Sequence, residues 1–529
     1  MRPLKLILGG LLGGALALGA ATAGTLIAPT PDSPVTLDVV HEADPALPDE
    51  AVAEDDGDGG GATAQPGPGQ VLAGAAAVSI TPQPDASKGE IWAKDGCIIL
   101  GEDAPDAPMH VADFRSTWPE NPNCLYMGGY GIGPMNPIYS IDPEFGLWVR
   151  SAALGDGTDT VVVTIIDGTS YFGDYAKLCD GCGAFDLATT MGTELSLPPS
   201  SFVIGSTHSH TAPDFIGGWG AVPQWYMDQV EAAIKTSIRT AVGSMEPAVL
   251  EAGEVLARQF NGERRDTYRS AEETFLTWFR ALEVDDEGDL TGQAIATVGA
   301  YAAHPVTADE SKRIGDADYP GVFERRVEER FGGVGLIFPT GLGNMSPRGN
   351  KVQMGDGLAG LLPEVGEGSL VSGTDVKSGQ TFWDQPVTNS GLTALGVPGF
   401  FDRPFAQNPA TVTVGKSANK PCRSASPISV RTAVSVAKVG DLTITAAPGE
   451  VFANLTNTLK ERSNGVVMPL AQANDGLGYI MQSFETDHAA RQVLGFAGEG
   501  VFEYEDAYSI DACFGDMVLE STISLIGSL

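Results

Sequence analysis

The chain has 529 residues, of which 43% are hydrophobic and 19% are charged. This is enough apolar material for a large core, and at about 150 residues per domain the length allows several domains or one large α/β domain with tails. The 68 acidic and 31 basic residues give a formal net charge of −37, which argues against nucleic acid as a partner and against electrostatic docking on anionic lipid.

The first residues have the pattern of a secretory signal peptide. Arg2 and Lys5 form a basic start, Leu6–Ala21 is apolar and small, and Ala21-Thr22-Ala23 fits a cleavage site. Five glycines interrupt the apolar run, which weakens the alternative of an uncleaved membrane anchor. We therefore predict that residues 1–23 are a signal peptide. The mature chain is expected to be secreted or to reside in the periplasm or cell envelope, without a transmembrane anchor.

Residues 24–70 are rich in Pro, Ala, Asp and Gly. The runs Glu54–Gly61 and Pro66–Gly69 lack the apolar side chains that a core needs, so we predict a disordered acidic tether. A calcium-binding acidic loop is the alternative, but the ordered ligand spacing of such loops is missing. Order is predicted to begin at Val71, and residues 71–529 are predicted to form one folded domain.

The chain contains six cysteines, and an even number in an exported protein favours disulfides. The predicted pairs are Cys97–Cys124, Cys179–Cys182 and Cys422–Cys513, although sequence alone leaves other pairings open. The C-x-x-C at residues 179–182 also fits half of a zinc knuckle or a redox pair. Because the second half of a knuckle is missing, we favour a small structural disulfide there.

Apolar runs and helical spacing alternate along the rest of the chain. The predicted strands are Ala73–Thr81, Thr160–Ile166, Phe202–Ile204, Ala294–Ala303, Val334–Phe338 and Leu442–Ala446. Helices are predicted over Pro223–Met245 and Tyr319–Phe331, and after Glu450 with Phe452, Leu455 and Leu459 facing inward. This alternation predicts an α/β fold, with a large mixed, mostly parallel sheet core and flanking helices. The glycine-rich turn Met127–Gly133 lacks the lysine of a phosphate-binding loop.

Polar residues follow several of these strands at the point where each strand ends. They are Asp167, the pair His208 and His210, His304, Asn344 with Ser346, and Glu450. Ligands of parallel sheets bind at the carboxyl ends of the strands, so these residues are expected to converge on one edge. In the histidine pair, residues i and i+2 on extended backbone would project from the same face.

His208, His304 and Glu450 make a two-histidine, one-carboxylate set that suits Zn²⁺ in a hydrolase. A catalytic zinc ion lowers the pKa of bound water and polarises a carbonyl group. His210 would then be placed for proton transfer or for holding an oxyanion. Simpler roles remain open, since His304 can end a strand and Glu450 can cap the next helix. A Ser/His/Asp hydrolase is the competing chemistry, but no Gly-x-Ser-x-Gly elbow lies near these residues.

Taken together, the motifs resemble the neutral ceramidase family, the neutral/alkaline non-lysosomal ceramidases. The likeness runs in order from about Ala73 to the C-terminus. It includes AGAAAVSIT followed by Pro82, Gly129-Tyr130-Gly131, Thr207-His208-Ser209-His210 with Pro213, Ala303-His304-Pro305, Gly343-Asn344-Met345-Ser346-Pro347, Pro448-Gly449-Glu450 and Asn474-Asp475-Gly476-Leu477-Gly478-Tyr479.

The resemblance implies a role for each matching residue. The implied zinc ligands are His208, His304, Glu450 and Tyr479, and His210 is implied as a catalytic aid at the oxyanion. Ser346 is implied as a nucleophile or a substrate contact, and we favour the contact because a metal-bound water already supplies a nucleophile. The segment from Asn261 matches a family segment with irregular spacing, which implies Arg264 or Arg265 in the site.

The implied activity is that of an exported zinc-dependent amidohydrolase. It would cleave the N-acyl amide of ceramide or a related N-acyl lipid to a free amine, such as a sphingoid base, and a fatty acid. The chain departs from the family in Val306-Thr307-Ala308 and in the Gly- and aromatic-rich Thr381–Asn408, and we expect no immunoglobulin-like C-terminal domain after the catalytic domain. Two alternatives therefore stay open: the same hydrolase acting on another N-acyl compound or an ester, and a non-catalytic envelope binding module.

Overall fold

The computed structural model describes residues 66–82, 91–92, 98–99, 124–130, 136–220, 222–265, 271–397, 401–417, 420–486 and 504–529. The predicted signal peptide and residues 24–65 of the predicted tether lie outside these ranges. So do Cys97 and the histidines at 41, 110 and 488. Strand β1 begins at Val71, the residue at which ordered structure is predicted to start. Among the described residues, no helix combines the length and apolarity needed to span a bilayer.

Nine strands form the main sheet, in the order β13, β11, β10, β8, β1, β5, β6, β7, with β15 paired to β8. Their bounds are β1 Val71–Ser79, β5 Trp148–Gly155, β6 Thr160–Ile166, β7 Phe202–Ser206, β8 Glu246–Leu256, β10 Phe275–Val284, β11 Leu290–Tyr301, β13 Val334–Pro339 and β15 Ser369–Leu370. The β-branched run of β6 is buried on both faces, as its composition predicts.

The α/β class, the large mixed sheet and the flanking helices are confirmed, but the expectation of mostly parallel pairing was wrong. Among the described strands of the main sheet, β6–β7 and β11–β13 are parallel, and the other neighbours are antiparallel. Strands β5, β8 and β10 escaped prediction because each carries a buried charge. Arg280 on β10 pairs with Glu251 on β8 at 2.9 Å, and Arg150 on β5 pairs with Glu324 at 2.9 Å.

A second sheet of four strands faces the main sheet, in the order β16, β19, β20, β22. Its strands are β16 Val376–Pro386, β19 Ser429–Val439, β20 Leu442–Ala446 and β22 Val466–Leu470, and only β20–β22 is parallel among them. Apolar side chains from both sheets share one buried cluster, which includes Val163 and Phe338 from the main sheet and Ile444 and Met468 from the second. One part of the core therefore lies between two sheets packed face to face.

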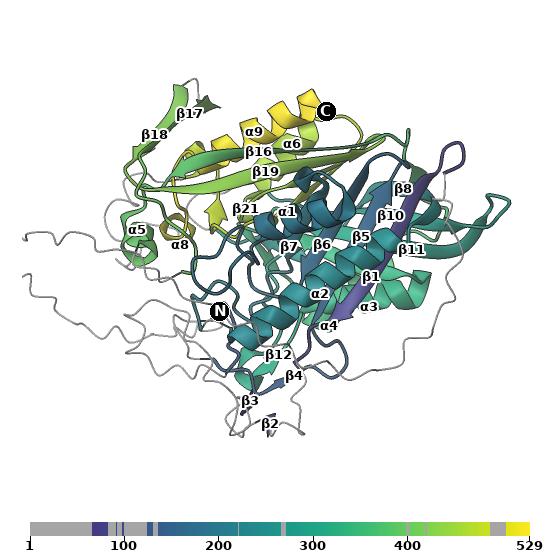
Figure 1. Cartoon of the computed structure of the whole chain (residues 1–529), viewed down its shortest axis with the longest axis horizontal. Coiled ribbons are helices and arrows are strands. Elements are labelled where there is room, and N and C mark those ends of the chain that lie inside the picture. Colours follow the sequence, from purple (N-terminus) through teal and green to yellow (C-terminus); the bar gives the residue numbers. More distant parts are fainter. Residues whose placement is uncertain are drawn as a thin grey trace, which may run out of the picture. The chain divides into compact units, whose positions relative to one another are not determined.

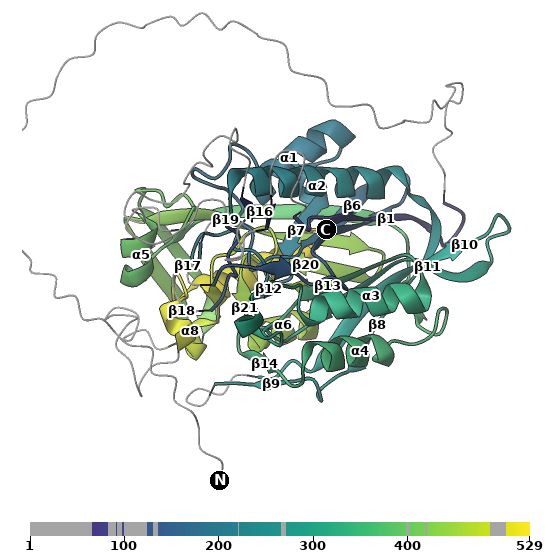
Figure 2. The ribbon, with the colours of Figure 1, turned by 90° about the horizontal axis from the view of Figure 1, so that it is seen from below.

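Helices cover the outer face of each sheet (Figures 1 and 2). The main sheet is covered by α1 Ala184–Leu195, α2 Gln224–Gly243, α3 Tyr319–Phe331 and α4 Lys351–Leu361, and the second sheet by α6 Ala453–Glu461 and α9 Phe514–Ser528. Helices α2, α3 and α6 confirm the predictions from spacing. Tyr226, Val230 and Ile234 of α2, for example, are fully buried against the sheet.

Smaller elements connect these layers. They are the strand pairs β2 Ile91–Trp92 with β3 Ile98–Ile99, β4 Ser140–Ile141 with β12 Ile314–Gly315, β9 Asn261–Glu263 with β14 Met345–Pro347, β17 Ala410–Ser417 with β18 Lys420–Ser426, and β21 Glu450–Val451 with β23 Tyr479–Ile480, and the helices η3 Pro199–Ser201, η4 Glu310–Lys312, α5 Ser390–Gly396, η5 Ser483–Glu485 and α8 Tyr504–Ala507. Two of the short pairs carry predicted site residues. Glu450 lies opposite Tyr479, and Ser346 lies opposite Gly262.

The segment after β22 ties both outer strands of the main sheet together. Ala471 donates its N–H to the carbonyl of Pro339 at the end of β13. Gln472 accepts from the N–H of Ser206 in β7, and Asn474 donates to the carbonyl of Ile204. The loops that follow β7, β13 and β22 therefore begin next to one another, although β7 and β13 lie at opposite ends of the strand order.

Two of the three predicted disulfides, Cys179–Cys182 and Cys422–Cys513, are confirmed. The third prediction involves Cys97, which lies outside the described residues. The Cys422–Cys513 bond joins β18 to the residue before α9, and so links two elements that are 91 residues apart in the chain.

Replacing both Cys422 and Cys513 with serine is expected to lower the free energy of unfolding by about 4 kcal/mol, because the bond restricts a long loop of the unfolded chain. The matched control replaces Cys179 and Cys182, whose separation of 3 residues restricts the unfolded chain far less. Denaturant unfolding of the three proteins without reductant measures the difference. Equal losses in the two variants would contradict this account.

Candidate metal centre

The histidine pair lies in a tight turn directly after β7. Thr207 still donates to the carbonyl of Ile166, as the next residue of a parallel strand would. His208 then adopts a left-handed backbone conformation with φ of 64°, which is uncommon for a non-glycine residue. The prediction that extended backbone aligns the pair was therefore wrong. The turn nevertheless brings the Nε2 atoms of His208 and His210 within 3.4 Å of each other.

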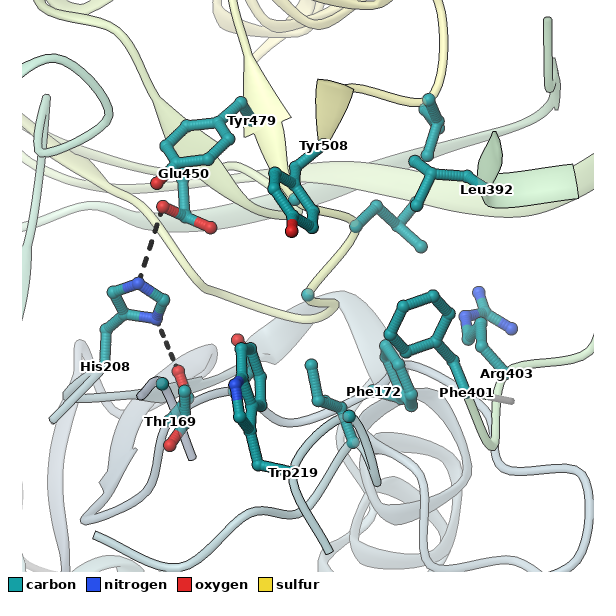
Figure 3. Close-up of a pocket in the computed structure, with 18 of the residues that line it drawn as sticks. Thr169, Phe172, His208, Trp219, Leu392, Phe401, Arg403, Glu450, Tyr479 and Tyr508 are labelled. Carbon is teal, nitrogen blue, oxygen red and sulfur yellow. Dashed lines mark hydrogen bonds and ion pairs between the residues drawn. The ribbon is translucent and has the colours of Figure 1, made fainter. Parts of the chain in front are cut away.

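Glu450 joins His208 to His304, which arrives from the loop after β11. The Oε2 atom of Glu450 lies 3.0 Å from Nε2 of His304 and 3.5 Å from Nε2 of His208. The Nδ1 atoms of both rings face backbone carbonyls instead, those of Thr169 and Met345. Figure 3 shows His208 held in this way between Thr169 and Glu450. Both imidazoles therefore direct Nε2 toward one carboxylate.

Tyr479 and Arg264 complete this cluster. The pairing of β21 with β23 puts Tyr479 beside Glu450, and its Oη atom lies 3.5 Å from Nε2 of His304. Arg264 donates from Nη2 to Oη of Tyr479 at 3.0 Å, and its Nη1 is 3.4 Å from Nδ1 of His304. The neighbouring Arg265 turns away and donates to the carbonyl of Glu485. Of the two arginines left open by the sequence, Arg264 is thus the one that contacts the cluster.

Other residues expected at the strand ends lie elsewhere. Ser346 is half-buried in β14 and is not among the described residues that line the pocket beside the cluster. Asp167 is buried, accepts from the N–H of Trp148 at 2.7 Å, and belongs to the charge network around Arg150. Asn344 accepts from the N–H of Ala453 and so holds the start of α6. Asp167 and Asn344 thus serve the scaffold around the cluster.

The charge states of the cluster favour a bound cation. Burial, with Arg264 nearby, lowers the pKa of His304 to about 4. Burial and the two neighbouring imidazoles also hold the pKa of His210 well below its usual value. Burial alone would raise the pKa of Glu450, but His208 and His304 outweigh it and hold this pKa well below the usual range. At neutral pH the cluster therefore offers the neutral imidazoles of His304 and His210 and the carboxylate of Glu450, the forms that bind metal ions.

The donor atoms fit a zinc ion. One nitrogen from each of His208, His210 and His304 lies within 4.8 Å of the others, so these three residues can share a metal ion. Zinc binds imidazole nitrogen and carboxylate oxygen in sets of three or four. A zinc-binding histidine usually presents its other ring nitrogen to a carbonyl or carboxylate, as His208 and His304 do here. The arrangement is compatible with two sets of four ligands. Both contain His208, His304 and Glu450, and the fourth ligand is either His210 or Tyr479.

A pocket of about 340 Å³ opens beside the cluster. His208, His210, Glu450 and Tyr479 line one end of it, and the walls are mainly apolar and aromatic. These walls include Phe172, Ile216, Trp219, Leu392, Phe401, Phe405, Leu477 and Ile510. In Figure 3, His208, Glu450 and Tyr479 lie at one end of the pocket, and Leu392, Phe401 and Arg403 lie at the other. Trp219 and Tyr508 lie between the two ends. Four of these lining residues, Leu392, Phe401, Arg403 and Phe405, come from the segment 381–408.

Sequence reasoning missed several residues of the site. Thr169, Trp219 and Glu505 carried no signal, because their roles depend on contacts with residues far away in the chain. Gly129 did carry a signal in the sequence, because it belongs to the glycine-rich turn Met127–Gly133. Its φ is +151°, and a Cβ atom there would lie 2.2 Å from Cγ of His210. Only glycine allows the backbone to approach the His210 ring so closely.

No protein-family model and no curated protein sequence matches the chain. Solved structures do match it. A neutral ceramidase from Pseudomonas aeruginosa superposes with a TM-score of 0.58 at 14% sequence identity, over 87% of this chain and 75% of that one. The chain has a ceramidase-like fold. A second structure, described as a ceramidase complexed with C2, gives a TM-score of 0.55 at 13% identity, over 87% of this chain and 76% of that one.

The electrostatics of the histidine–glutamate cluster predict acid sensitivity in the metal-free protein. The folded-state pKa of His304 lies below its unfolded value of 6.5, so the unfolded chain binds more protons between about pH 4 and pH 6.5. Stability is therefore expected to fall as the pH drops through this window, by about 3 kcal/mol from His304 alone. Denaturant unfolding in the presence of a chelator measures this, with His304→Gln as the control that lacks the titrating ring. An equal pH dependence in both proteins would contradict the assignment.

Proposed function

We propose that this protein is an exported zinc-dependent amide hydrolase of ceramidase type. It cleaves the N-acyl amide of ceramide or a related N-acyl lipid to a free amine and a fatty acid. The observation that carries the proposal is the pair of buried imidazoles, on His208 and His304, directed at the Glu450 carboxylate at the end of an apolar pocket. The fold shared with two ceramidase structures supports it.

His208, His304, Glu450 and Tyr479 are the proposed zinc ligands. When bound, zinc supplies a Lewis acid for the amide carbonyl and a water molecule of lowered pKa. Arg264 holds the Tyr479 oxygen from outside the ligand set, with a hydrogen bond of 3.0 Å. The carbonyls of Thr169 and Met345 fix the orientation of the two rings. Because these partners are already in place, the ligands need little rearrangement to bind the ion.

His210 is the proposed proton carrier and oxyanion donor. Hydrolysis adds water across the amide C–N bond, so the hydroxyl group joins the carbonyl carbon and the proton released by the water must reach the departing nitrogen. His210 lines the pocket beside His208, and its low pKa keeps the ring neutral and able to accept a proton. Ser346 is kept only as a proposed substrate contact, on the family resemblance alone, because it is not among the described residues that line the pocket.

The pocket supports an apolar chain next to the reacting carbonyl. Its polar end carries the histidines, and its walls carry Trp219, Phe401 and Leu392. A fatty acyl or sphingoid chain would be desolvated along these side chains while the amide lies at the polar end. The net charge of −37 disfavours docking on anionic lipid, so recognition would depend on the apolar walls.

An oxidising compartment fits the disulfides of the described residues. Cys179–Cys182 and Cys422–Cys513 are both formed, and such bonds persist outside the cytosol. Together with the signal-peptide pattern of residues 1–23, they support a secreted or cell-envelope location.

The zinc site predicts a defined loss of activity. His208→Ala and His304→Ala are each expected to lose bound zinc and to lower kcat/KM for a fluorescent N-acyl sphingosine by about 1,000-fold or more, because each removes a ligand of the ion. Metal analysis and turnover are measured together, with Arg239→Ala, which breaks a surface ion pair with Glu194, as the control.

Chelation should abolish turnover of the wild-type protein, and added Zn²⁺ should restore it. Full activity in both histidine variants would refute the proposal. A panel containing other N-acyl compounds and esters separates the ceramidase activity from the same hydrolase chemistry on another substrate. Wild-type protein that turns over no amide or ester would instead favour a binding module.

Gly129→Ala is expected to lower kcat by about 100-fold while zinc stays bound, because the new methyl group displaces the His210 ring but leaves His208, His304 and Glu450 in place. The control is Gly292→Ala, which also has a positive φ, of +86°, but has open space around the added Cβ. Turnover and zinc content of both variants are compared with those of the wild type. An unchanged kcat in Gly129→Ala would argue against a catalytic role for His210.

A further inference from the structure

Glu505 lies directly behind the proposed metal ligands. It belongs to the short helix α8, and only 2% of its surface is exposed. Its Oε1 atom accepts from Nε of Arg264 at 2.9 Å, and its Oε2 atom lies 3.9 Å from Nε of Arg265. The residue comes from the C-terminal part of the chain, 241 positions after Arg264. A buried carboxylate thus meets an arginine that contacts two proposed metal ligands.

The geometry of Arg264 makes this contact consequential. A guanidinium group is a rigid planar fork, so fixing Nε also fixes the direction of both Nη atoms. With Nε held by Glu505, Nη2 donates to Oη of Tyr479 at 3.0 Å and to the carbonyl of Gly343 at 3.0 Å. The direction in which Arg264 donates its hydrogen bond to the Tyr479 oxygen therefore depends on the position of the Glu505 carboxylate.

The charge of Glu505 matters as well as its position. Arg264 places a positive charge 3.4 Å from His304, on the side away from Glu450. Without a partner, that charge would oppose the arrival of a divalent cation at the same histidine. The Glu505 carboxylate, at 2.9 Å from Arg264, offsets it. Position and charge therefore act in the same direction, toward stronger metal binding.

We propose that Glu505 is a positioning residue that aims Arg264 at Tyr479 and thereby strengthens the binding of zinc at the site. This rests on the proposed function for the identity of the ion and its ligands. Glu505 contacts neither the ion nor the substrate, and its effect passes through Arg264. Substitutions of such outer residues typically weaken metal binding by about 10- to 100-fold.

The adjacent Asp506 offers a matched control. It is buried to a similar degree, with 1% of its surface exposed, and its Oδ2 atom lies 3.4 Å from Nη2 of Arg265. Arg265 turns away from the cluster toward the carbonyl of Glu485. Asp506→Asn therefore removes a buried carboxylate from the same helix, and this carboxylate also pairs with an arginine. The pair between Glu505 and Arg264, the arginine that contacts Tyr479, stays intact.

The test compares Glu505→Gln with Asp506→Asn in the full-length protein. Zinc affinity is measured by competition with a chromophoric chelator, and the visible spectrum of the Co²⁺-loaded protein reports the ligand geometry. Glu505→Gln is expected to weaken zinc binding by at least about 10-fold and to change the Co²⁺ spectrum, whereas Asp506→Asn leaves both as in the wild type. Wild-type zinc affinity in Glu505→Gln, or an equal loss in Asp506→Asn, overturns the proposal.

Arg264→Lys serves as the second variant if Glu505→Gln does not fold, because lysine keeps the charge but loses the fork. It is expected to weaken zinc binding to a similar extent, and an unchanged affinity overturns the proposal. Zinc binding by a wild-type protein that cleaves no amide would refute the proposed function, while the comparison would still decide the role of Glu505. A wild-type protein that binds no zinc would refute both.

Discussion

The carboxylate of Glu450 between two buried imidazoles is the interaction on which the rest of the site depends. Its oxygen lies 3.0 Å from one ring nitrogen and 3.5 Å from the other. Three polar side chains gathered in a largely buried position are costly unless each finds a partner. Here the rings are oriented by backbone carbonyls and the carboxylate by the rings, so each of the three side chains has a partner and all three are already arranged to receive an ion.

The architecture explains how residues so far apart in sequence meet. His208 follows β7 and His304 follows β11, and these strands lie in different parts of the main sheet. The second sheet supplies Glu450 after β20 and Tyr479 after β22. The segment Ala471–Asn474 bonds to β7 and to the end of β13 at once, which brings the loops together. The centre is therefore built where two sheets are joined, and not along one parallel edge.

Part of this arrangement could be predicted from the sequence. The β-branched run of β6 and the helical spacing of α2 identify their elements, and polar residues after apolar strands identify His208, His304 and Glu450. Tyr479 came only from the family resemblance, because a phenol is an uncommon ligand. The predictions of strands and helices succeed where a local pattern carries the information, and the structure brings the three polar residues together.

The remainder depends on contacts that no local pattern encodes. Strands β5, β8 and β10 have buried charges whose partners are distant, so they do not resemble apolar strands. Adjacent residues of extended backbone point in opposite directions, and spacing alone could not choose between Arg264 and Arg265. Glu505 gains its place only from the fold, as a buried carboxylate beside Arg264.

The most direct test of a zinc centre at this junction is anomalous diffraction at the zinc absorption edge, from crystals of the zinc-loaded protein. We predict one strong peak at about 2.0–2.2 Å from Nε2 of His208, Nε2 of His304 and a carboxylate oxygen of Glu450. A zinc-loaded crystal with no peak among these three side chains, or with its peak elsewhere in the fold, would contradict it.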